Sequence, residues 1–128
     1  MSKPFSPDWW RRFQERVNQD PELAVTGKWF STPFSITRGS ERVVLRVENG
    51  RIADIVHAPR FDVRTSFGLR GPETLWQNFL LPTPPPLYHD IFAMIMRVPD
   101  LVLEGDTLVA MQNARALHRM MNVMREVR

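Results

Sequence analysis

The dipeptide Asn49-Gly50 constrains the fold most, because it joins two segments whose composition suits paired strands. RVVLRVE precedes it and RIADIVH follows it. Asn-Gly readily adopts the positive φ angles of a two-residue β-hairpin turn. In the first segment an apolar face would lie opposite a charged one: Val43, Leu45 and Val47 against Arg46 and Glu48.

Other extended segments surround this hairpin and predict a larger sheet. The pattern from Trp29 to His57 is extended, with Pro33 at an edge or bulge and a turn at Gly39-Ser40. Apolar and polar residues alternate from Phe61 to Arg70, and residues 101–103 form a last short apolar run. We therefore expect a mainly antiparallel five-stranded sheet with one dry face and one wet face.

Two helix starts precede the sheet. Ser6-Pro7-Asp8 supplies a cap, a proline where its missing N–H is harmless, and an acid near the positive end of the helix dipole. Asp20-Pro21-Glu22 repeats this pattern and predicts a short helix that closes near Gly27.

Helical periodicity returns after the sheet. Leu75, Trp76, Phe79 and Leu80 form a stripe that ends at Pro82. A stiff proline-rich connector, PTPPP, leads to a second apolar helix predicted over residues 87–96. The last helix is expected to begin at Asp106 and to continue to about Val127.

The last helix carries an unusually wide apolar surface. Two stripes lie side by side on it: Ala110, Ala114, Leu117, Met121 and Met124 in one, and Ala116, Met120, Val123 and Val127 in the other. A helix that covers a sheet needs only one stripe, so this helix should also contact more core, a partner subunit or a ligand. Methionine is flexible and polarizable, so a methionine-rich wall could adapt to varied apolar ligands.

Length and composition favour one globular domain over residues 1–128, with residues 1–20 as a peripheral N-terminal helix. The chain has no cysteine, which excludes disulfides and thiolate metal sites. Its net charge of +3 comes from scattered arginines rather than from one basic run, so we do not expect a nucleic-acid partner. No apolar run approaches the roughly 20 residues that span a bilayer. We expect a cytoplasmic protein without stable membrane insertion.

The sequence offers little for catalysis. His57, His89 and His118 have no metal-ligand spacing, and there is neither a Gly-x-Ser-x-Gly elbow nor a phosphate-binding loop. Tyr88-His89-Asp90 is the nearest group to an acid–base set, but neighbours on a helix point about 100° apart. We therefore expect no catalytic residue, no metal and no cofactor.

The order of these elements resembles the sterol carrier protein type-2 family, also called the non-specific lipid-transfer family. The resemblance covers the chain from about Pro21 onward. It rests on Asn49-Gly50, on FGLRGPETLWQNFL at residues 67–80 and on LVLEGDTLVAMQNARALHRMM at residues 101–121. It implies an α+β domain whose helices cover one face of the sheet and enclose an apolar tunnel for lipids, acyl chains or sterols, with no chemistry of its own.

This resemblance suggests a non-catalytic binding protein for a lipid, a fatty acid or another small hydrophobic molecule. The C-terminal REVR is not a peroxisomal Ser-Lys-Leu address, and an arginine-rich chain with two lysines suits a bacterial source. Face and family topology together predict the ligand contacts: Phe67, Trp76, Phe79, Leu80, Phe92, Met94, Met96, Met111, Leu117 and Met121.

Two alternatives remain open at this stage. The wide last helix and an exposed Trp9-Trp10 pair could form an interaction surface, for example in a homodimer or beside an enzyme. An enzyme could instead use the tunnel as its active site, with Tyr88, His89 or Asp90 as acid or base.

Overall fold

The computed structural model describes residues 3–59 and 63–127. Its elements follow in this order: α1 (Pro7–Asn18), α2 (Pro21–Thr26), β1 (Pro33–Arg38), β2 (Glu41–Glu48), β3 (Arg51–His57), β4 (Phe67–Gly71), α3 (Glu73–Phe79), α4 (Ile91–Arg97), β5 (Val102–Gly105), α5 (Thr107–Gln112), α6 (Ala114–Val123) and a 3₁₀ turn (Met124–Glu126).

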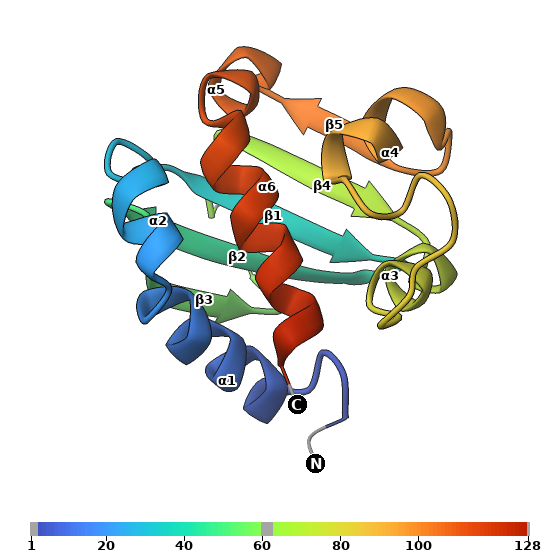
Figure 1. Cartoon of the computed structure of the whole chain (residues 1–128), viewed down its shortest axis with the longest axis horizontal. Helices are drawn as coiled ribbons and strands as arrows, with labels where there is room; N and C mark the ends of the chain where they lie inside the picture. Colours follow the sequence, from blue (N-terminus) through green and yellow to red (C-terminus); the bar gives the residue numbers. More distant parts are fainter. Residues whose placement is uncertain (1–2, 60–62, 128) are drawn as a thin grey trace.

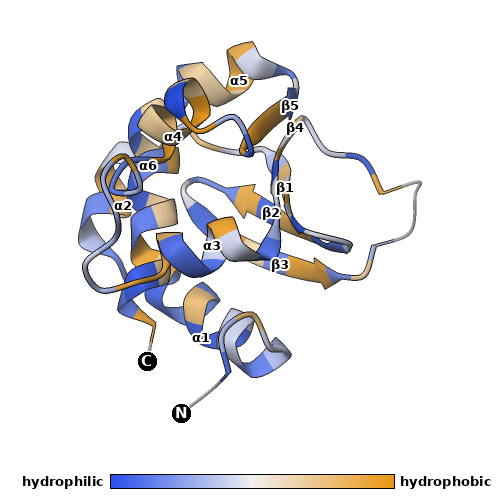
Figure 2. Ribbon diagram, turned by 90° about the vertical axis from the view of Figure 1, so that its right-hand side faces the viewer, coloured by the Kyte–Doolittle hydropathy of each residue, from blue (hydrophilic) through white to orange (hydrophobic). Residues whose placement is uncertain are grey.

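The five strands form one sheet in the order β3-β2-β1-β4-β5. Strands β1 and β4 are parallel, with Phe34 opposite Phe67, and the other three pairs are antiparallel. Helix α6 crosses one face of the sheet, with α1 and α2 beside it (Figure 1). Figure 2 shows the sheet in side view with the helices gathered on one side of it. The predicted α+β class and the mainly antiparallel sheet are confirmed.

The hairpin at Asn49-Gly50 forms as predicted. Asn49 and Gly50 have φ angles of 53° and 77°, as a tight two-residue turn requires. The alternating residues Val43, Leu45 and Val47 are buried in the core. Gly50 also lies against Gly27, where the backbones of the hairpin and of α2 approach so closely that neither position has room for a side chain.

The predicted helix caps are also present. The Ser6 hydroxyl accepts a hydrogen bond from the Trp9 amide at 3.2 Å, and the Asp20 carboxylate accepts one from the Leu23 amide at 3.0 Å. Asp106 caps α5 through the Val109 amide at 3.2 Å. Local sequence therefore sets where these three helices begin.

The prediction of one continuous last helix is wrong. The helix breaks at Asn113, whose φ of −111° and ψ of 27° end α5 and turn the chain into α6. The Asn113 amide group donates to the Val109 carbonyl at 2.9 Å, and asparagine competes with the helix ladder in this way. The break allows α5 to leave the direction of α6, as Figure 1 shows.

The predicted strand over residues 61–70 is shorter than expected. Phe61 and Asp62 lie outside the described residues, and residues 63–66 are not in a strand. The strand begins at Phe67, and Ser66 before it bonds to both neighbouring strand ends through its backbone. Its N–H donates to the Pro33 carbonyl at 2.8 Å, and its carbonyl accepts from the Asp106 N–H at 2.7 Å.

The predicted helix over residues 87–96 also starts later. Leu87 has a φ of 77°, which no α-helix accommodates, and α4 begins at Ile91 after the Asp90 cap. The last strand is shifted from residues 101–103 to Val102–Gly105. None of the helices in residues 3–59 and 63–127 is long and apolar enough to cross a membrane.

Candidate functional site

The apolar interior between the sheet and the helices is the candidate site. Six of the predicted contacts are fully buried in one continuous cluster: Phe67, Trp76, Phe79, Met94, Leu117 and Met121. Leu80 and Phe92 are half-buried and pack against the same cluster. The fold therefore brings together eight of the ten residues, although their role as ligand contacts stays a prediction.

The other two predicted contacts lie outside this interior. Met96 on α4 is 81% exposed and Met111 on α5 is 52% exposed. Both residues lie on helices as predicted, but face and family topology assigned them to the wrong side: on α4 the buried methionine is Met94 rather than Met96, and on α5 the buried residue is Ala110 rather than Met111.

The wide apolar surface of α6 is covered on both sides. Ala116, Leu117, Met120, Met121 and Val123 are all buried, and α6 contacts α1, α2, α4 and α5. The sequence left three explanations for the double stripe: more core, a partner subunit or a ligand. In the structure, core side chains and neighbouring helices cover this surface of α6. The buried side chains leave almost no surface that water can reach, so an apolar ligand must displace some of them.

Polar contacts anchor the C-terminal end of α6. The Arg125 guanidinium lies 4.2 Å from the Phe79 ring and donates to the Phe79 carbonyl at 2.7 Å, to the Tyr88 carbonyl and to the Asn122 side chain. Burial lowers the pKa of Arg125 from its ordinary value. These bonds tie α6 to both ends of the proline-rich connector.

A second aromatic cluster lies at the N-terminus. The Phe5 ring is 4.9 Å from Trp9 and 5.9 Å from Trp10, and Trp9 stacks 5.7 Å from Phe13. Both tryptophans are buried, so the prediction of an exposed Trp9-Trp10 pair is wrong. The reason is the turn from Lys3 to Ser6, which folds Phe5 back over α1 and covers the pair.

Arg38 borders this cluster and carries a buried charge. The residue is 9% exposed, and its guanidinium lies 4.3 Å above the Phe5 ring. Its Nη1 donates to Glu73 at 2.8 Å, whereas its Nε is buried and has no hydrogen-bond partner among the described residues. The Trp10 indole N–H is likewise buried without a hydrogen-bond partner among the described residues. Buried donors of this kind are uncommon in native proteins.

An apolar hollow of about 330 Å³ opens beside Phe5. Its walls come from the N-terminal turn, from α3 and from the start of the proline-rich connector: Lys3, Pro4, Phe5, Glu73, Gln77, Leu80, Leu81 and Pro82. Leu80 is the predicted contact that lies in this wall. Sequence reasoning missed Phe5 and Arg38, since no local pattern indicates that residues 5 and 38 meet.

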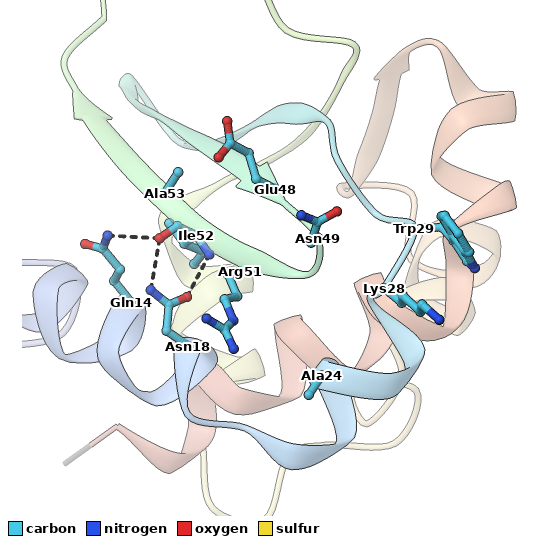
Figure 3. Close-up of a pocket in the computed structure, with 10 residues that line it drawn as sticks. All are labelled: Gln14, Asn18, Ala24, Lys28, Trp29, Glu48, Asn49, Arg51, Ile52 and Ala53. Atoms are coloured by element: carbon cyan, nitrogen blue, oxygen red, sulfur yellow. Dashed lines mark hydrogen bonds between the residues drawn. The ribbon is translucent and has the colours of Figure 1, made fainter.

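A larger and more polar hollow, of about 770 Å³, lies between α1, α2 and the β2–β3 hairpin (Figure 3). The amide groups of Gln14 and Asn18 both donate to the Ile52 carbonyl at 3.0 Å, and the Ile52 N–H donates back to Asn18 at 2.8 Å. These bonds give hydrogen-bond partners to the backbone N–H and carbonyl of Ile52 on the outer edge of β3. The side chain of Trp29 at the rim is 83% exposed.

The acid–base residues named by the sequence do not form a relay. Asp90 caps α4 and lies 3.3 Å from Nδ1 of His118, while Asn122 is 3.1 Å from Nε2 of the same ring. The described residues contain no group of three or more histidine, aspartate or glutamate side chains placed to hold a metal ion.

Solved structures share this architecture, although no protein-family model and no curated protein matches the sequence. Sterol carrier protein 2 superposes with a TM-score of 0.79 at 18% identity, over 98% of this chain and 100% of that one. A Thermus thermophilus protein described as possibly a sterol carrier protein gives 0.75 at 19% identity, over 98% and 90%. The ubiquinone synthesis protein UbiJ-SCP2 gives 0.62 at 12% identity, over 98% of both chains. The chain thus has the sterol carrier protein fold that its sequence resembled.

Proposed function

We propose that this protein binds and carries a small hydrophobic or lipid-like molecule without transforming it. The observation that carries the proposal is the single apolar interior between sheet and helices, in a fold shared over almost the whole chain with proteins named sterol carrier protein 2. Asp90 caps α4 and Asp20 pairs with Arg119, so these two carboxylates have structural roles, which supports a binding role rather than a catalytic one.

The energetic basis is burial of an apolar chain. Each CH₂ group removed from water contributes about 0.8 kcal/mol, so a twelve-carbon chain gains roughly 9 kcal/mol before the costs of ordering it and of opening the protein. Met94, Met120 and Met121 lie in the buried cluster, and their three rotatable bonds let them change shape to admit a chain.

The alternative of an interaction surface loses its main support. It depended on exposed Trp9 and Trp10 and on an uncovered face of the last helix, but both tryptophans and the wide apolar surface of α6 are buried within the chain, and Leu108 and Met111 on α5 are the large apolar side chains of that helix that stay exposed. The proposal of an apolar ligand does not depend on such a surface.

Native mass spectrometry and thermal unfolding with dodecanol test the proposal. Gently purified protein is expected to carry a bound apolar molecule or to bind one equivalent of dodecanol, with a rise in Tm as ligand is added. If saturating dodecanol gives neither a bound mass nor a change in Tm, the proposal is wrong.

A further inference from the structure

We infer that Arg38 is the headgroup site for an anionic amphiphile that ends in a carboxylate, and that the Phe5 ring covers this site until the ligand displaces it. The inference rests on the proposed function, because it adds a headgroup to an apolar ligand. It depends on three features: the buried cation of Arg38, the strained turn that contains Phe5, and the apolar hollow beside Phe5.

Arg38 has the donor arrangement that a carboxylate needs. Its Nη1 is engaged by Glu73, but its Nε is buried without a partner among the described residues. Guanidinium donors form a rigid planar fork that matches the two oxygens of a carboxylate. A second buried donor without a described partner, the Trp10 indole N–H, belongs to a ring 5.9 Å from Phe5. Polar groups held dry in this way are costly unless an acceptor reaches them.

Phe5 occupies the approach to Arg38 in a conformation that favours its release. Its ring lies 4.3 Å from the guanidinium carbon, so it covers the cation directly. Its φ of 67° lies in the left-handed region, which an aromatic residue rarely adopts. Within the described residues, the Ser6 N–H closes this turn by donating to the Lys3 carbonyl at 3.1 Å. Opening this turn relieves the strain and uncovers the guanidinium.

The hollow beside Phe5 supplies the apolar side of the site. Phe5 and Glu73 both line it, and both contact Arg38, so the hollow adjoins the guanidinium through these two side chains. Leu80, Leu81 and Pro82 offer an apolar wall for a hydrocarbon chain. Lys3 at the same hollow adds a positive charge, so the site keeps a net positive charge although Glu73 is present.

Binding of dodecanoate and dodecanol, compared at pH 8 below their aggregation concentrations, tests the inference. The two probes share one chain length and differ in the headgroup. We expect the wild-type protein to bind dodecanoate at least tenfold more tightly than dodecanol. Arg38→Met should remove this preference. Arg70→Met is the matched control, because Arg70 lies on the same sheet in an exposed pair with Glu104, and this variant should keep the preference.

Phe5→Ala tests the covering role separately. Removing the ring should raise the affinity for dodecanoate at least fivefold, whereas a residue that merely forms a wall would lower it. Unchanged or weaker binding overturns the role given to Phe5. NMR of the wild-type protein needs no variant: the Arg38 Nε–H signal should move downfield with dodecanoate and much less with dodecanol. Equal movement with both probes overturns the headgroup site.

The outcomes separate the inference from the function on which it rests. If neither probe binds, the proposed function fails and the headgroup site fails with it. If dodecanol binds and dodecanoate binds no better, or if Arg38→Met keeps the preference, only the headgroup site fails.

Discussion

Asp20 joins two ends of the molecule through a single carboxylate, and its substitution gives a quantitative test of the fold. Its Oδ2 accepts from the Leu23 N–H at 3.0 Å and from Arg119 Nε at 3.1 Å, and its Oδ1 accepts from Arg119 Nη2 at 2.7 Å. The Asp20 side chain is 8% exposed. One residue therefore caps α2 and holds α6 against it.

The size of the expected loss in stability follows from these bonds. Hydrogen bonds to a charged partner contribute about 1.5–3 kcal/mol, so Asp20→Asn, which keeps a capping oxygen, should lower the free energy of unfolding by about 2 kcal/mol. Asp20→Ala also removes the cap and should cost about 3 kcal/mol. With an unfolding entropy of about 2.1 cal/mol/K per residue, 2 kcal/mol lowers the Tm of a chain of this length by roughly 7 °C.

The effect of Asp20 should also depend on pH with a definite sign. The hydrogen bonds from Arg119 hold the pKa of Asp20 below its ordinary value. A depressed folded-state pKa contributes stability above the unfolded pKa of about 3.9, and that stability is lost as the pH falls through the folded pKa. The difference between wild type and Asp20→Asn should therefore be largest at pH 7 and should shrink as the pH falls from 5 to 3.

Urea unfolding at pH 7, 5 and 3 measures this difference. Glu104→Gln is the control, because Glu104 pairs with Arg70 on the exposed surface and should cost less than about 1 kcal/mol. A cost below about 0.5 kcal/mol for Asp20→Asn, constant from pH 7 to pH 3, would refute the assigned role of this ion pair.

Two further predictions test the close backbone contact and the placement of the tryptophans. Gly27→Ala should lower the free energy of unfolding by about 2–3 kcal/mol, because the added Cβ would lie 2.7 Å from the Gly50 Cα. Gly39→Ala, at a φ of +57° with open space around it, should cost only about 1 kcal/mol in the same urea titration, and equal costs would contradict the contact. Trp29→Phe should abolish iodide quenching of tryptophan fluorescence, since Trp9, Trp10 and Trp76 are buried. Quenching that survives in this variant would show that one of those three is accessible.

Much of the fold could be predicted because its determinants are local. Asn49-Gly50 forces a turn by its own backbone preference, and Ser6 and Asp20 begin helices through amides three residues away. A bond between neighbours in sequence needs no knowledge of the rest of the chain. The hairpin and these helix starts were therefore predicted correctly, and the order of elements led to the right fold.

The errors arose where distant residues decide the outcome or where a single polar side chain interrupts an apolar pattern. Phe5 covers Trp9 and Trp10 where the N-terminal turn meets the end of β1. The sequence near residue 5 does not indicate that Phe5 contacts Arg38. The apolar pattern continues through Asn113, so periodicity alone gives one helix where the structure has two. Met96 and Met111 were assigned to the interior by face and family topology, and both are exposed. A pattern reports which residues share a face, but the partner of that face is set by contacts across the fold.

Ion pairs and charged hydrogen bonds hold some of the elements around the interior more firmly than others. Arg119 ties α6 to α2 through Asp20, Arg16 on α1 pairs with Glu126 just after α6, and Arg125 ties the same end to the proline-rich connector. Because α6 is held at several points, its displacement would break charged contacts together. The described part of the N-terminal turn carries a strained Phe5 and is held by the Ser6–Lys3 backbone hydrogen bond and by the packing of the Phe5 ring on Trp9 and Trp10, with no charged pair among these contacts. A ligand should therefore gain access past Phe5 rather than beneath α6, which also places Arg38 first on its path.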